Sequence, residues 1–281
     1  MIISRRSWFQ LGGGALLARA IRAAGLPVKI GVTDWNLRQE AKLAAVELAK
    51  RLGFDGVEIS IGVGTEKLPL SEAALQKQYV EEGRRIDLPI PSTCLNILHR
   101  NVLKSDPLAQ RWVAESIPIT RNVGARVILL PFFGKGALQT RQEMDFVADY
   151  LREIAPEAEK AGVVLGLEDT CSAEDNARML ERARSRAVRV YYDIGNSTNG
   201  GFDVVREIRW LGGERICEFH LKDNPNFLGQ GKIDIPAVIE AIAEIGFRGW
   251  AHLETTTPTK SVEDDMTVNL RYVRGLIARR G

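Results

Sequence analysis

The fold is indicated most directly by one stretch, Ile216-Cys217-Glu218-Phe219-His220-Leu221-Lys222-Asp223. It is apolar and β-prone for most of its length and ends in a group of charges, as expected of a buried strand in a parallel sheet. Alternate residues of a strand share a face, so Glu218, His220 and Lys222 point the same way. A polar row of this kind is costly to bury unless it is paired or holds a ligand.

Three other strand-like stretches also end in a carboxylate, and they are Val163–Glu168, Val188–Asp193 and Gly249–Glu254. Successive polar residues at these strand ends are separated by 25 residues (Glu168 to Asp193), 27 residues (Asp193 to His220) and 34 residues (His220 to Glu254). Each separation is close to the length of one strand–helix unit, roughly 30 residues. Consecutive units of a parallel barrel would bring these ends together at one rim. Two glutamates, an aspartate and a histidine there form an oxygen-rich ligand set for a divalent cation.

From Val28 onward, strand-like runs alternate with amphipathic helical patterns. The remaining predicted strands are Val28–Trp35, Gly56–Ser60, Pro89–Asn96 and Arg126–Phe132. The predicted helices are about Leu43–Leu52, Ser71–Ile86 with Ser71 as N-cap, Pro107–Asn122, Thr140–Ala161, Glu174–Ala183, Asp203–Leu211, Pro236–Ile245 and Val262–Arg279. Eight strands and eight helices in strict alternation predict a single (β/α)8 TIM barrel. A doubly wound open sheet is the alternative, but no G-x-G-x-x-G follows the first strand.

The amino-acid composition of the chain restricts the classes of function that it can have. A chain of 281 residues with 45% hydrophobic residues can bury the core of one barrel. Its formal charge of +2 is too small to argue for nucleic acid or an acidic membrane surface as a partner. The three cysteines are odd in number and contain no C-x-x-C, so neither a disulfide framework nor a zinc site is predicted.

Residues 1–24 differ from the rest of the chain. Ser4-Arg5-Arg6-Ser7-Trp8-Phe9 resembles a twin-arginine export signal, and Ala18-Arg19-Ala20 is an acceptable cleavage site. The apolar run Leu11–Ala18 is too short to span a bilayer, which needs about 20 apolar residues. We therefore expect a leader at 1–24, the barrel at 25–281 and a periplasmic location. The alternative is a basic, frayed N-terminal helix on a cytoplasmic protein.

The chain resembles the xylose isomerase-like TIM barrels of sugar isomerases and epimerases, which include ketose 3-epimerases and hydroxypyruvate isomerases. The motifs that carry the resemblance are, in order, Gly53–Ile59, Glu168, Asp193–Asn196, His220–Asp223, Gly229–Asp234 and Gly246–Glu254. The resemblance covers residues 28–279. Each motif is weak alone, but the ordered set is specific to the superfamily without being specific to a substrate.

The resemblance implies one bound divalent metal ion, Mn²⁺, Mg²⁺ or Co²⁺. The ligands that it implies are Glu168, Asp193, His220 and Glu254. It also implies that the two glutamates move protons on opposite faces of a sugar, with Glu174 as an accessory acid. Asn196 and Asn226 depart from the ketose 3-epimerases, which carry histidine and arginine there. Both departures count against a simple ketose 3-epimerase.

Other polar and aromatic residues fall near the same strand ends. Lys222 would hold a substrate oxygen, help proton transfer, or pair with Glu218 or Asp223 instead. The predicted substrate contacts are Trp35, Asn96, His99, Glu174 and Asn196. Trp35, Phe132 and Phe133 would form an apolar wall for a sugar ring or else ordinary core. We expect Glu58 to be an interior hydrogen-bonding acid. We expect His252 to support the site or to belong to the core rather than to bind metal.

The predicted function is a metal-dependent sugar isomerase or epimerase that works through an enediolate, with Glu168, Glu254 and Lys222 as catalytic residues. A lyase or isomerase of 3-oxo sugars or glycosides is a close variant, since its first proton transfer is the same. A non-catalytic sugar-binding barrel is the alternative from another class. A repair endonuclease is excluded because three histidines are too few for its trinuclear zinc centre. The expected partner is a small sugar, and homo-oligomerisation stays open.

Overall fold

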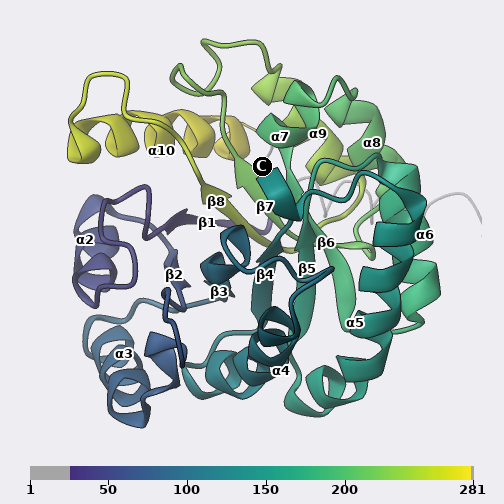
Figure 1. Cartoon of the computed structure of the whole chain (residues 1–281). Coiled ribbons are helices and arrows are strands. Elements are labelled where there is room, and N and C mark those ends of the chain that lie inside the picture. The colour runs from purple at the N-terminus through teal and green to yellow at the C-terminus, as the bar shows by residue number, and fades with distance from the viewer. Residues whose placement is uncertain (1–25, 280–281) are drawn as a thin grey trace, which may run out of the picture.

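Most of the stretch Ile216–Asp223 forms β7 (Ile216–Leu221), which lies between β6 (Val188–Asp193) and β8 (Gly249–Leu253) (Figure 1). All strands are parallel, and the sheet closes because β1 (Val28–Thr33) pairs with β8 as well as with β2 (Gly56–Ser60). The predicted (β/α)8 TIM barrel is confirmed. The open doubly wound sheet is wrong, since the closed barrel leaves no unpaired edge strand.

The structure, a computed structural model, describes residues 26–279. The other strands are β3 (Ser92–Cys94), β4 (Val127–Pro131) and β5 (Val164–Glu168). The helices are α2 (Ala44–Leu52), α3 (Ala73–Ile86), α4 (Pro107–Asn122), α5 (Arg141–Ala161), α6 (Ala173–Ala183), α7 (Ile194–Asn199), α8 (Val204–Leu211), α9 (Ile235–Glu244) and α10 (Val262–Ala278), with short 3₁₀ helices η1 (Pro69–Ser71), η2 (Asn96–His99) and η3 (Gly134–Gly136). The long helices surround the barrel (Figure 1).

Helix α5 begins and ends as its sequence predicts. Thr140 Oγ1 accepts from the backbone N–H of Glu143, and the Glu143 carboxylate accepts from that of Thr140, which makes a capping box. Gly162 ends the helix in the left-handed region at φ 66°, where a residue without Cβ is favoured. Lys104 Nζ lies 2.6 Å from Glu143 Oε1 and ties this helix start to the loop that precedes α4.

Replacing Glu143 with glutamine is expected to lower stability at neutral pH but not in acid. The hydrogen bonds from Lys104 and from the backbone of Gln139 and Thr140 lower the pKa of Glu143 to about 2. A carboxyl whose folded pKa is lowered contributes stability above its unfolded value of 4.5, and loses it as pH falls towards 2. The group is solvent-screened, so we expect a cost of about 0.5–1 kcal/mol at pH 7. Urea unfolding of both proteins should show this difference shrinking below pH 4.5; a pH-independent difference would contradict the assignment.

Two of the predicted boundaries that differ from the structure have clear local reasons. The third strand covers Ser92–Cys94 instead of Pro89–Asn96, because proline lacks the N–H that a ladder needs and η2 already begins at Asn96. Ser71 is not the N-cap of α3. It ends η1, and its hydroxyl donates to Leu68 O, while Glu72 takes the N-cap position.

Helix α7 is absent from the predicted elements. Its sequence, Ile-Gly-Asn-Ser-Thr-Asn, consists largely of weak helix formers. Asp193 begins it as N-cap, because its Oδ1 accepts from the backbone N–H groups of Gly195 and Asn196 at 2.7 and 2.8 Å. The carboxylate at the end of β6 therefore also shapes the turn that follows.

Buried side chains fall into two zones. The main apolar core lies between the strands and the surrounding helices. A separate small cluster consists of Cys94, Val127, Leu129 and Tyr191. Polar side chains are also almost completely buried, namely Glu58, Glu218, His220 and His252. Buried charge of this kind is unfavourable unless it is paired, so each of these side chains needs a polar partner.

The predicted leader, residues 1–24, lies outside the described residues. Within residues 26–279, no helix combines the length and the apolar character that crossing a membrane requires. Cys94, Cys171 and Cys217 are free thiols, as expected from their spacing.

Candidate metal and substrate site

Four side chains meet at the carboxyl ends of β5 to β8, and we call them the rim cluster: Glu168, Asp193, His220 and Glu254. Glu168 and Asp193 are the last residues of their strands, and Glu254 directly follows β8. Asp193 and His220 are register partners on neighbouring strands. One ligand atom from each residue lies within 4.8 Å of the others. The structure therefore brings together the four residues that the sequence nominates as metal ligands.

His220 lies at the centre of the rim cluster. Its Nδ1 is 3.1 Å from Glu168 Oε1, 3.4 Å from Glu254 Oε2 and 3.6 Å from Asp193 Oδ2. Burial by itself would lower the pKa of the imidazole, but the carboxylates of Glu254 and Glu168 outweigh it and raise the pKa well above its ordinary value. The imidazole and its acidic neighbours therefore stabilise one another electrostatically.

A second layer of side chains orients this imidazole. Its Nε2 lies 3.0 Å from Glu58 Oε2, which also accepts a hydrogen bond from Tyr191 OH at 2.8 Å. Glu58 is thus the interior hydrogen-bonding acid that the sequence predicts. Because Nε2 donates to Glu58, Nδ1 is the nitrogen that can act as a ligand. His252 lies 3.1 Å from Glu218 Oε2 and is no part of the rim cluster.

Lys222 directly follows β7, and its side chain contacts two members of the rim cluster. Its Nζ lies 2.6 Å from Asp193 Oδ2 and 2.5 Å from Glu254 Oε2. Burial would lower the pKa of this amine, but Asp193 and Glu254 outweigh it and raise the pKa. The alternative pairing of Lys222 with Glu218 or Asp223 is wrong. The ammonium is engaged with two candidate ligands instead.

Asp223 has a different task, which the sequence analysis missed. Its two carboxylate oxygens accept from the backbone N–H groups of Gly229, Gly231, Lys232 and Ile233. Gly231 is required there, because a Cβ would lie 2.1 Å from Asp223 Oδ1. The side chain of Asp223 therefore holds the loop Gly229-Gln230-Gly231. In the sequence, this contact could have been inferred from an aspartate that is followed by two closely spaced glycines.

The donor set fits a divalent cation. Asp193 Oδ2 is buried without a hydrogen-bond partner, and its close cationic neighbour is the ammonium of Lys222. Burial, with the nearby Glu254 and Asp193 carboxylates, raises the pKa of Glu168 to about 8 although His220 opposes the shift. Three carboxylates and one imidazole crowded in this way are a ligand set of the kind that binds Mn²⁺ or Mg²⁺.

A cavity of about 340 Å³, here called the rim cavity, opens beside these residues. It is large enough for a small organic ligand. The predicted contacts Trp35, Asn96, His99 and Asn196 all line it. Trp35 Nε1 donates to Glu254 Oε1 at 3.0 Å, and Asn196 Nδ2 donates to Glu168 Oε1 at 3.3 Å. The rim cluster therefore forms one end of a site that already has substrate-sized space.

Two of the predicted contacts are not brought to the rim cavity. Glu174 is exposed in the first turn of α6 and is not among the lining residues, because Ser172 caps that helix and directs position 174 outward. Phe132 is buried in the main core, whereas Phe133 lines the rim cavity. The geometry gives Glu174 and Phe132 no contact with a ligand at this position.

The loop after β1 supplies a lining residue that the sequence analysis missed, Glu40. Asp34 shapes this loop, since its Oδ2 accepts from the backbone N–H groups of Ala41 and Ser60. Asn96 Nδ2 donates to Glu40 Oε1 and so holds that carboxylate at the edge of the rim cavity. Nothing in the local sequence marks Glu40, because its partner is 56 residues away.

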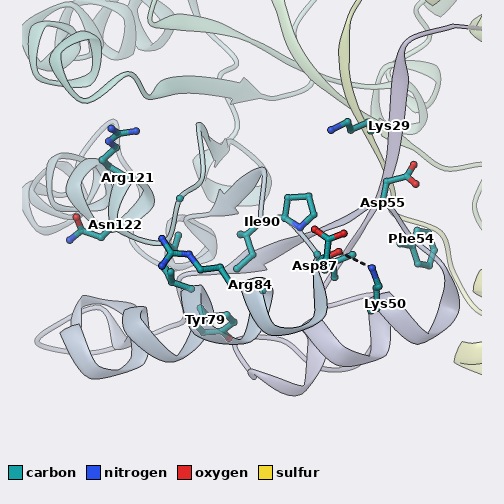
Figure 2. A pocket seen from close by; sticks show the side chains of 16 residues that line it. Lys29, Lys50, Phe54, Asp55, Tyr79, Arg84, Asp87, Ile90, Arg121 and Asn122 are labelled. Atoms are coloured by element: carbon teal, nitrogen blue, oxygen red, sulfur yellow. Dashed lines mark hydrogen bonds between the residues drawn. The ribbon is translucent and has the colours of Figure 1, made fainter.

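A larger cavity of about 920 Å³, whose lining residues are drawn in Figure 2, lies at the other end of the barrel. Its lining residues precede strands: Asp55 comes before β2, Ile90 before β3 and Asn122 before β4. The contact drawn there joins Lys50 Nζ to the backbone oxygen of Asp87 at 2.8 Å. In barrels of this kind the reactive groups lie at the carboxyl ends of the strands. The larger cavity is therefore not the candidate active site.

Comparison with known proteins agrees with this architecture. A family model described as a xylose isomerase-like TIM barrel matches residues 46–274. The 2-epi-5-epi-valiolone 7-phosphate 2-epimerase of an Actinoplanes species is 27% identical over 204 residues, covering 70% of this chain and 73% of that protein. The L-ribulose-5-phosphate 3-epimerase UlaE of Shigella flexneri serotype 5b is 30% identical over 237 residues, covering 75% and 80%. The apo structure of the 3-keto-D-glucoside 4-epimerase YcjR from E. coli superposes with a TM-score of 0.74 at 17% identity, over 88% of this chain and 99% of that one.

Proposed function

The chain belongs to the xylose isomerase-like TIM barrel family, and on that premise we propose that it is a divalent-metal-dependent enzyme that isomerises or epimerises a sugar. Sequence relatives with most of their length covered by this chain are named epimerases of phosphorylated substrates, one of them L-ribulose 5-phosphate. The single observation that carries the proposal is the rim cluster, with three carboxylates and an imidazole whose ligand atoms lie within 4.8 Å of one another beside a cavity.

The residues of the rim cluster have separable tasks in this proposal. Glu168, Asp193, His220 and Glu254 would hold the cation. When bound, it would polarise a substrate carbonyl and acidify the adjacent C–H bond. Glu168 and Glu254 also line the rim cavity, so one carboxylate can remove that proton and the other can return a proton to the substrate.

Neighbouring side chains support this proton transfer. Trp35 holds one oxygen of Glu254, and Lys222 holds the other. Asn196 holds an oxygen of Glu168. These contacts restrict both carboxylates to defined rotamers, which is the preorganisation that a proton-transfer site needs. Lys222 also lines the rim cavity, where its ammonium fixes the Glu254 carboxylate beside the substrate.

Deuterium incorporation from heavy water tests the proposal directly. We expect protein reconstituted with Mn²⁺ to exchange a carbon-bound proton of a ketose or ketose phosphate, and chelator-treated protein to lose that exchange. Mass spectrometry would follow the label, and elemental analysis would count the metal. Binding of sugar without exchange would favour a non-catalytic sugar-binding barrel. Failure to retain a divalent ion after added Mn²⁺ would contradict the metal-dependent mechanism.

A further inference from the structure

We infer that the substrate is an uncharged sugar rather than a sugar phosphate, and that Glu40 is the residue that disfavours the phosphate. The inference rests on the proposed function and concerns the specificity of the same site. The observations that carry it are the charges that line the rim cavity and the position of Glu40 within it. It sets this chain apart from relatives whose names specify sugar phosphates.

Three carboxyl groups line the rim cavity. Those of Glu168 and Glu254 would hold the cation, so Glu40 is the acidic residue of this lining that is not a candidate ligand. Within the described residues, Lys222 is the one lysine or arginine in that lining. Its ammonium already lies within 2.6 Å of two carboxylate oxygens. A phosphate dianion therefore meets no lysine or arginine that is free to neutralise it, and such groups normally bind phosphate.

The terminal phosphate of a sugar whose carbonyl meets the rim cluster would lie towards the other end of the rim cavity. Glu40 is exposed, whereas Asp193 and His220 are buried, so Glu40 marks the outer part of the site. Its carboxylate is held there by the amide of Asn96, whose own oxygen accepts from the backbone N–H of Gly62. This anchored negative charge opposes a phosphate, while a hydroxyl group can donate to it.

The remaining outer wall suits an uncharged ring or chain. His99 and Phe133 stack with ring centroids 6.1 Å apart and an interplanar angle of 23°. Partial burial lowers the pKa of His99, so its ring adds no positive charge at neutral pH. Arg100 and Lys135 follow these aromatic residues closely in the chain and are exposed, but neither lines the rim cavity. The pair of rings offers apolar faces to the C–H groups of a sugar.

The experiment compares matched substrates on the metal-loaded protein. Deuterium exchange would be measured on D-fructose, D-tagatose, L-ribulose and D-xylulose, and on the terminal phosphate of each sugar. We expect the parent protein to prefer the neutral member of a pair by about 100-fold or more in kcat/KM, as apposition of like charges costs several kcal/mol. In Glu40→Lys this ratio should fall at least about tenfold. Glu66→Gln, which removes an exposed carboxylate that does not line the rim cavity, should leave the ratio unchanged.

The outcomes separate this inference from the proposed function. Faster exchange of the phosphates by the parent protein would overturn the inference and leave the isomerase proposal intact. A neutral preference that is the same in Glu40→Lys would overturn the role of Glu40. Absence of exchange on every neutral and phosphorylated sugar, with metal bound, would instead contradict the proposed function itself.

Discussion

Replacing His220 with alanine is expected to abolish stable metal binding. The imidazole contributes one of four candidate ligand atoms, and its Nδ1 lies within 3.6 Å of the other three residues. Mutation of residues that merely orient a ligand commonly costs 10–100-fold in affinity. Loss of a ligand should therefore weaken binding by at least about 100-fold. Elemental analysis after dialysis should find about one ion per chain in the parent protein and little in the variant.

The His220 experiment must distinguish loss of the metal ion from loss of the folded structure. The substitution also leaves Glu58 and Glu168 without their imidazole partner in the interior, and an uncompensated buried charge is destabilising. His220→Gln preserves much of the volume and a polar group, and should likewise lose metal while keeping the barrel's circular dichroism spectrum. His99→Ala removes a histidine outside the rim cluster and should retain the ion. Full metal occupancy in both His220 variants would rule out this ligand set.

Changing Glu254 to glutamine is expected to slow deuterium exchange by about 10²–10⁴-fold, the range that general acid–base catalysis supplies. The amide keeps the size of the side chain and one oxygen, but it cannot accept the substrate proton. It also presents N–H groups towards Trp35 Nε1 or Lys222 Nζ, both of which donate to the carboxylate in the native protein. Glu168→Gln should give a loss of the same order, because Glu168 lines the same cavity.

Assays of the glutamine variants need saturating Mn²⁺, so that weaker metal binding is not mistaken for a loss of proton transfer. Metal content and sugar binding would be measured on the same samples. Glu181→Gln removes an exposed carboxylate on α6 and should exchange at the parent rate. Metal-loaded Glu168→Gln and Glu254→Gln proteins that exchange within about threefold of the parent would exclude these carboxylates as the acid and base.

Most of the fold follows from patterns that are local in sequence. Alternation of strand-like and helical segments predicted all eight strands, because each segment's periodicity reflects the face that it buries. The errors occur where side chains override that pattern. Asp193 begins the unpredicted α7 with its own carboxylate, and Pro89 shortens the third strand by lacking an N–H group.

The candidate site was predictable to the extent that it depends on topology. Parallel strands in a closed barrel all end at one rim, so polar residues at the ends of β5 to β8 had to converge once the barrel was inferred. Trp35, Asn96 and Asn196 reach the rim cavity for the same reason. Glu174 does not, since a position in the first turn of a helix depends on the helix register rather than on a strand end.

The closed barrel and the four residues of the rim cluster could thus be inferred from the amino-acid sequence. Three features became visible in the folded protein: Lys222 contacts Asp193 and Glu254, Asp223 closes its own loop, and Glu40 lines the rim cavity. Periodicity and strand ends are properties of consecutive residues, whereas the partners of a buried charge come from whichever distant strands and loops the closed barrel places within hydrogen-bonding distance.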